Sequence, residues 1–176
     1  HEAVRKTLPY MMEMREYFHA HPELSEKEFD TCKTIFQELS LMGIEDVKII
    51  AGTGVTGLIR GAHPGPVILL RADIDALPLT EKYDCPYASL VPGVMHACGH
   101  DGHTAMGLAV AEVLMNLRDQ LHGKIKLLFQ PAEEGVRGAK SMVDRGLLDV
   151  VDYVIATHMG QRADGVSQVS FTEDGT

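Results

Sequence analysis

The 176-residue sequence predicts a three-layer αβα domain built on a mixed, mostly parallel sheet. Short continuous apolar runs, typical of strands buried on both faces, alternate with longer stretches of helical periodicity. That alternation is typical of α/β proteins. With 45% hydrophobic and 23% charged residues, the chain is also long enough to form one sizeable core.

The N-terminal part is expected to form two helices. Apolar side chains in Leu8–His19 recur with close to a 3.6-residue period, which indicates the first helix. The second is expected after the Pro22 break and before Gly43. Ser25 and Glu28 have the spacing of a capping box at its start.

The remaining chain is expected to form a hairpin and then alternating strands and helices. Thr104 is a plausible N-cap, and Gly123 separates a helix from the strand that follows. The hairpin is expected at 47–50 and 55–59, the strands at 67–70, 125–129 and 153–156, and the helices at 105–121 and 139–145.

Composition excludes several classes of function. The formal net charge of −9, without a basic stripe, argues against a nucleic-acid partner. No run approaches the roughly 20 apolar residues that span a membrane. The first ten residues do not have the pattern of a secretory signal. Three irregularly spaced cysteines favour a reducing compartment, so a cytoplasmic location is expected.

The segment Met95–Thr104 contains one cysteine, one aspartate and three histidines. Thiolate and imidazole suit zinc or a similar divalent ion, and Cys98 and His100 are the two candidate ligands. His103 is expected to begin a helix, and His96 to support a ligand without binding the ion. The alternative for Cys98 is a nucleophile with His100 as its base. That alternative leaves the acidic and histidine motifs elsewhere unexplained.

Those other motifs also follow predicted strands, where open α/β sheets place their sites. Glu133 and Glu134 are adjacent, so one can bind a metal while the other acts as a base. His158 directly follows the last predicted strand and is a further candidate ligand.

Two further sets of polar residues are expected to play supporting roles. Asp75 is expected to orient a ligand histidine, although the acids of Arg71–Asp75 could instead pair with Arg71. His19 and His21 are expected to cap or pack the first two helices, far from the strand ends.

Four motifs of the chain stand out together with His158: RADIDALP (71–78), MHACGHDGHTA (95–105), FQPAEEG (129–135) and HPELS (21–25). They resemble the M20 metallopeptidases, within them the amidohydrolase branch of hippurate hydrolase, N-acyl-amino-acid amidohydrolases and plant auxin-conjugate hydrolases. The segment after the two glutamates is more similar to the aminobenzoyl-glutamate hydrolases.

The resemblance implies that Cys98 bridges two divalent ions, that His100 and His158 bind one ion, and that Glu134 binds the other. Glu133 is then the general base. Thiolate and imidazole favour zinc, whereas the resemblance leaves manganese, nickel or cobalt open. It also implies that residues 1–176 are the N-terminal part of the metal-binding catalytic domain. A last histidine ligand and a lid and dimerisation domain lie outside, and the full-length protein is expected to be a homodimer or heteromer.

The sequence therefore predicts a metal-dependent amidohydrolase that cleaves N-acyl or N-aroyl amino acids by a metal-activated water, with Glu133 as base. Alternatives are an M20 dipeptidase or carboxypeptidase, and a non-catalytic metal-binding fragment or degenerate relative. The expected partner is a small N-acyl amino acid or a dipeptide.

Overall fold

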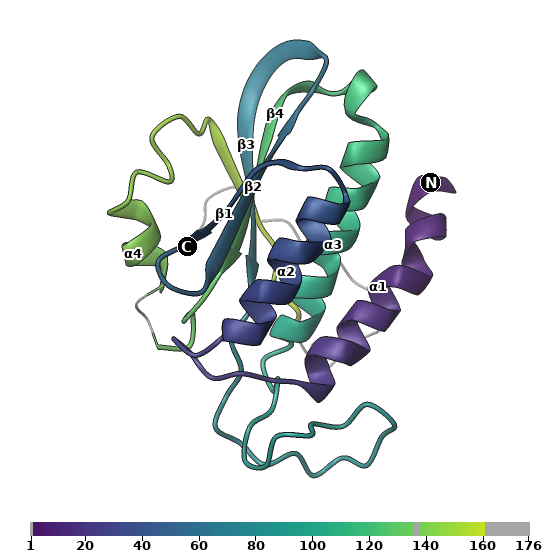
Figure 1. Cartoon of the computed structure of the whole chain (residues 1–176), viewed down its shortest axis with the longest axis vertical. Helices are drawn as coiled ribbons and strands as arrows, with labels where there is room; N and C mark the ends of the chain where they lie inside the picture. The colour runs from purple at the N-terminus through teal and green to yellow at the C-terminus, as the bar shows by residue number, and fades with distance from the viewer. Residues whose placement is uncertain (1, 136–137, 161–176) are drawn as a thin grey trace.

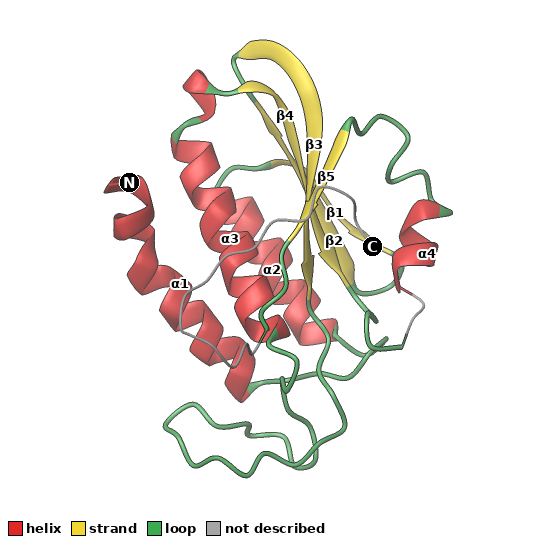
Figure 2. Cartoon of the chain, turned by 180° about the vertical axis from the view of Figure 1, so that it is seen from behind, coloured by secondary structure: helices red, strands yellow, loops and turns green. Residues whose placement is uncertain are grey.

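The computed structural model describes residues 2–135 and 138–160, which form one sheet covered by helices on both faces (Figure 1). Seen from behind, three helices lie on one side of the sheet and a short one on the other (Figure 2). The three are α1 (Glu2–Ala20), α2 (Phe29–Leu41) and α3 (His100–Asn116), and the short one is α4 (Gly138–Val143). A 3-10 turn, η1 (Arg118–Gln120), follows α3. The predicted αβα layering is confirmed.

The sheet has five strands in the order β1-β2-β4-β3-β5. β1 and β2 form the expected hairpin and β2 is antiparallel to β4, whereas β3 is parallel to both β4 and β5. The sheet is therefore mixed, and its parallel half is the one from which the predicted ligand motifs emerge. The strands are β1 (Glu45–Ile50), β2 (Gly54–Arg60), β3 (His63–Asp73), β4 (His122–Gln130) and β5 (Tyr153–Ala156).

Two apolar cores lie on opposite faces of this sheet. The larger one joins α1, α2 and α3 to the strands and includes Phe18, Ile35 and Phe129. The smaller one packs Leu69 and Leu128 of the sheet against the region of α4. Burial on both faces explains why β3 and β4 appear as continuous apolar runs rather than as alternating ones. Within the described residues, no helix combines the length and apolar character that crossing a bilayer requires.

The predicted capping box at α2 is wrong. The helix begins after Glu28, whose side chain makes no capping hydrogen bond. Glu23 takes that place, because its carboxylate accepts hydrogen bonds from the backbone N–H groups of Asp30 and Thr31 at 3.2 and 2.7 Å. Ser25 donates instead to Asp75, so the turn before α2 faces the strand ends.

The predicted N-cap of α3 is also wrong. The helix starts four residues before Thr104, and its N-cap is Gly99 in the left-handed conformation with φ 83°. That conformation suits glycine, which has no Cβ to clash. The Thr104 hydroxyl donates to the His100 carbonyl at 2.8 Å inside the helix. His100 therefore lies on the first helical turn rather than on a loop.

Candidate metal centre

The predicted ligands converge at one edge of the parallel half of the sheet. β3, β4 and β5 run in the same direction and end at Asp73, Gln130 and Ala156. Asp75, the two glutamates and His158 follow those three ends within a few residues. The carboxyl ends of adjacent parallel strands open into a crevice, which is where α/β proteins place their sites.

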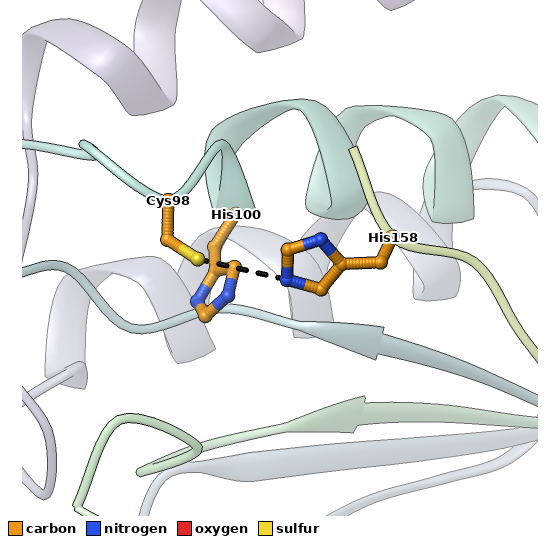
Figure 3. A group of neighbouring side chains, drawn as sticks. All are labelled: Cys98, His100 and His158. Carbon is orange, nitrogen blue, oxygen red and sulfur yellow. Dashed lines mark hydrogen bonds between the residues drawn. The ribbon is translucent and has the colours of Figure 1, made fainter. Parts of the chain in front are cut away.

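Cys98, His100 and His158 form a first donor group, in which one donor atom of each lies within 4.8 Å of the others. Figure 3 shows the three side chains pointing toward one another, with 3.6 Å between Cys98 Sγ and His158 Nε2. The other nitrogen of His158, Nδ1, lies 2.7 Å from the Met159 carbonyl. Because a carbonyl only accepts, Nδ1 carries the proton and Nε2 presents its lone pair toward the sulfur.

His100, Glu133 and Glu134 form a second donor group within the same 4.8 Å limit. His100 Nε2 lies 3.9 Å from the Glu133 carboxylate. His100 Nε2 and Glu134 Oε1 are buried without any hydrogen-bond partner. Buried polar atoms of this kind are rare and indicate an absent partner. Because thiolate, imidazole and carboxylate together suit a divalent ion, these residues fit a metal centre.

Asp75 contacts two of the predicted ligands at once. His100 Nδ1 donates to the Asp75 carbonyl at 2.9 Å and lies 3.1 Å from Asp75 Oδ1. Asp75 Oδ2 accepts hydrogen bonds from the Ser25 hydroxyl at 2.7 Å and from the Glu134 backbone N–H at 3.0 Å. A proton held on Nδ1 leaves His100 Nε2 free to bind a cation, which is how carboxylates orient metal-binding histidines.

Charges around His100 favour a cation in this crevice. Burial alone would raise the pKa of Asp75, but hydrogen bonds from His100, Ser25 and the Glu134 backbone lower it. Burial alone would lower the pKa of His100, but the carboxylates of Asp75 and Asp73 raise it. In the absence of another cation, the negative surroundings therefore draw a proton to His100.

The thiol of Cys98 is in surroundings that disfavour a free thiolate. Burial, a hydrogen bond to Glu134 and the charge of Glu133 raise the pKa of Cys98 to about 11. Nucleophilic cysteines have the opposite surroundings, in which positive charge lowers the pKa. This argues against the cysteine-hydrolase alternative. A coordinated dication would remove the thiol proton, as metal centres do.

His103 supports the segment that carries His158. Its Nε2 accepts the Met159 backbone N–H at 2.9 Å, a contact that the sequence analysis missed. Asp73, His100 and His103 also lie close enough to form a third donor group. However, Arg71 already pairs with Asp73 at 2.6 Å. Asp73 at the end of β3 thus pairs with Arg71, whereas Asp75, two residues beyond the strand, contacts His100.

The other histidines do not join a donor group among the described residues. His96 is buried without a hydrogen-bond partner, and burial lowers its pKa to about 4. His21 Nδ1 lies 2.8 Å from the Tyr17 carbonyl, which fits the predicted capping role. The predicted distance of His19 from the strand ends is wrong.

His19 lies beside the helix that carries His100. Its ring nitrogens are 2.8 Å from Asp101 and 3.0 Å from Glu81. The two residues meet because α1 packs along α3, so that the C-terminal end of α1 reaches the first turn of α3. Asp101 is adjacent to His100 in sequence, and Arg15 also contacts it at 2.9 Å. Helix packing of this kind has no counterpart in sequence spacing.

Several known proteins are similar to this chain in sequence. The chain is 45% identical over 159 residues to thermostable carboxypeptidase 1 of Saccharolobus solfataricus, a match that covers 89% of this chain and 40% of that protein. It is 50% identical over 145 residues to N-acetyl-L-cysteine deacetylase of Bacillus subtilis, covering 82% of this chain and 35% of that protein. The chain thus spans about two fifths of the length of such relatives.

A solved structure has the same fold. The YXEP protein of Bacillus subtilis, described as a dinuclear metal-binding peptidase of the M20 family, superposes with a TM-score of 0.84 at 42% identity. The match covers 88% of this chain and 43% of that one. Residues 69–172, which include every predicted ligand, match the description "Peptidase family M20/M25/M40". The chain belongs to this M20 peptidase family.

Proposed function

We propose that the full-length protein is a metal-dependent amidohydrolase that releases an amino acid from an N-acyl or N-aroyl amino acid. The observation that carries this proposal is the convergence of Cys98, His100 and His158 in one donor group and of His100 with the two glutamates in another. The two adjoining donor groups fit a pair of divalent ions, with His100 giving its free Nε2 to one of them. The donor types favour zinc, and the resemblance leaves manganese, nickel or cobalt open.

Cys98, His100, Glu134 and His158 would hold the ions. When bound, a pair of divalent ions polarises the amide carbonyl and makes water nucleophilic at neutral pH. Glu134 is suited to binding because one of its oxygens is buried without a partner. Asp75 orients both His100 and the backbone of Glu134, so it acts on the site without touching the substrate.

Glu133 is the proposed general base. Its side chain is 37% exposed, whereas the His100 side chain beside it is fully buried. A half-exposed carboxylate can reach both water and a substrate. In this role Glu133 takes a proton from the attacking water and delivers it to the departing amine, so that the amide C–N bond breaks to a carboxylic acid and an amine.

The substrate class follows from chemistry and from relatives. The names of the two relatives describe removal of an acetyl group from an amino acid and removal of a carboxyl-terminal residue. Both reactions cleave an amide bond to an amino acid. We therefore propose small N-acyl amino acids, with aminobenzoyl-glutamate and dipeptides as related substrates.

The three cysteines are unpaired, which supports a reducing, cytoplasmic location.

The domain assignment is part of the same proposal. We infer from the resemblance that residues 1–176 form the N-terminal part of a catalytic domain, and the chain covers only about two fifths of its relatives' length, as a part of a longer protein would. A further ligand and a dimerisation domain would then come from elsewhere in the full-length protein.

The test replaces Glu133 by Gln in the full-length protein. This variant is expected to bind zinc or manganese as the wild type does, and to hydrolyse hippurate roughly 10²–10⁴-fold more slowly. Glu134→Gln is the matched control, because it removes the adjacent carboxylate and is expected to weaken metal binding itself. Elemental analysis and hydrolysis assays with hippurate, aminobenzoyl-glutamate and a dipeptide measure both effects.

If the Glu133→Gln variant hydrolyses its substrate at the wild-type rate, Glu133 is not the general base. Activity that survives chelation but is lost on alkylation of Cys98 would instead support the cysteine nucleophile. Metal binding without hydrolysis of any of the three substrates would support the non-catalytic alternative.

A further inference from the structure

The turn that carries the two glutamates has an unusual backbone. Ala132, directly before Glu133, adopts a left-handed conformation with φ 54°. Residues with a Cβ rarely adopt positive φ, and such conformations persist only where the surrounding structure enforces them. The conformation matters here because it sets the direction in which the next two side chains leave the end of β4.

Glu28 contacts this turn from the far end of the sequence. Its carboxylate accepts the Ala132 backbone N–H at 2.8 Å and the Thr53 hydroxyl at 2.6 Å. The Glu28 side chain is 0% exposed, and Thr53 and Ala132 are buried as well. A buried carboxylate is costly unless hydrogen bonds compensate it. Both of its contacts therefore need to form for this arrangement to be stable.

A second buried carboxylate holds the other side of Glu133. Asp75 accepts the Glu134 backbone N–H at 3.0 Å. The backbone N–H groups of Ala132 and Glu134, on either side of Glu133, thus both donate to buried carboxylates. Ser25 donates to Asp75 and lies three residues before Glu28. One loop therefore carries both Glu28, which bonds Ala132, and Ser25, which bonds Asp75.

Glu28 has no other evident structural task. It does not cap α2, because Glu23 accepts those helix N–H groups. Among residues 2–135 and 138–160, no basic side chain forms an ion pair with it. Its carboxylate is used for Ala132 and Thr53.

We propose that Glu28 is a positioning residue that holds the Ala132 turn in its left-handed conformation and thereby directs Glu133 and Glu134 into the metal centre. The inference rests on the proposed function for the roles of those two glutamates. Without an acceptor at position 28, the Ala132 N–H is buried and unpaired, and the turn relaxes toward a conformation that satisfies it. Glu134 then no longer points at its donor group.

The test measures the affinity of the metal-free full-length protein for manganese or zinc by competition with a chromophoric chelator. Glu28→Met keeps most of the side-chain volume but removes the acceptor, and is expected to weaken metal binding by about 10–100-fold. Glu28→Gln retains an acceptor for Ala132 and an amide that can donate to Thr53. The metal affinity of Glu28→Gln is expected to stay within about threefold of the wild-type value. This change is smaller than the one expected for Glu28→Met, which loses the supporting contact.

Glu23→Met is the matched control on the same loop. It removes two hydrogen bonds at the start of α2 but none at the glutamate turn. We expect it to lower the melting temperature and to leave metal affinity unchanged. A general destabilisation of the loop would instead weaken metal binding in both methionine variants.

A second-site change separates positioning from stability. Glycine adopts positive φ without strain, so Ala132→Gly no longer needs Glu28 to enforce the turn. We expect Ala132→Gly to restore most of the lost metal affinity in the Glu28→Met background without restoring the melting temperature.

The inference is overturned if Glu28→Met binds metal like the wild type, or if Ala132→Gly gives no recovery. These outcomes are independent of hydrolysis. A wild-type protein that binds metal but cleaves no amide would contradict the proposed function and leave the affinity comparison to decide the role of Glu28.

Discussion

The two ends of the metal centre differ in how firmly the fold holds them. At the inner end, His100 is 0% exposed and contacts both the carboxylate and the carbonyl of Asp75. At the outer end, His158 is exposed and follows β5, whose four residues are exposed as well. Its ring nitrogens contact the carbonyl of its neighbour Met159 and the Cys98 sulfur, and among the described residues it contacts no buried carboxylate. We therefore expect the inner end to contribute to the stability of the domain, and the outer end to contribute mainly to ion binding in the proposed metal centre.

The sharpest test of this difference compares His100→Ala with His158→Ala. Both variants should lose metal affinity. In the metal-free protein, His100→Ala is expected to lower the free energy of unfolding by about 3–5 kcal/mol, because it leaves the buried Asp75 carboxylate without its charged partner. His158→Ala is expected to change it by only about 0.5 kcal/mol, as for other exposed positions. Urea unfolding measures both, and equal losses would contradict the comparison.

A pH titration extends the comparison to His96, which is buried beside the inner end. Burial lowers its pKa from 6.5 to about 4, so the folded state disfavours the proton. The contribution to stability is present above pH 6.5 and is lost as the pH falls toward 4. At about 1.4 kcal/mol per pKa unit, the loss is on the order of 3 kcal/mol.

The measurement is urea unfolding of metal-free wild type and His96→Gln at about pH 7.5 and about pH 4.5, on either side of the ordinary histidine pKa. The variant lacks the titrating ring and should lose less stability between the two pH values. If both proteins lose the same amount, His96 is not the group responsible.

Asp75→Asn tests the orientation of His100 with the smallest expected effect. The amide retains one oxygen for Ser25 and Glu134, but its NH₂ then faces the His100 Nδ1 proton. The Asp75 carbonyl still accepts from Nδ1, which limits the damage. Metal affinity is expected to fall by about 10–100-fold, the usual effect of losing such a partner. Isothermal titration with manganese measures it, and unchanged affinity would show that the carbonyl alone orients the ring.

Much of the fold was predictable, because it depends on local patterns. The continuous apolar runs of β3 and β4 and the turn between β1 and β2 have clear signatures in the sequence. Helix starts were predicted less well. Ser25 and Thr104 have the residue types of caps, but their hydroxyls bond Asp75 and the His100 carbonyl instead. Cap-forming residues also satisfy other polar groups, and only tertiary contacts decide between these uses.

The convergence of the candidate ligands could be predicted because their chemistry is unusual and their positions follow strands. Asp75 was expected beside a ligand histidine and does contact His100, but the other residues that contact the site could not be predicted. Glu28 is 104 residues away from Ala132 in sequence, and the hydrogen bond between them depends on how α2 packs against β1 and β2. The role of His103 could not be assigned from sequence because its hydrogen-bond partner is the Met159 backbone N–H, and a backbone group has no signature in the sequence. The roles of the site residues and the extent of the domain remain predictions.

Asp152 has a consequence for how this protein tolerates changes in length. Its backbone N–H donates to the Val67 carbonyl at 2.9 Å, and its carboxylate accepts the Val67 N–H at 2.8 Å. These two bonds align β5 with β3 just before the strand begins. A slip of one residue would turn every following side chain to the opposite face. Insertions and deletions between α4 and β5 should therefore be tolerated only where Asp152 stays opposite Val67.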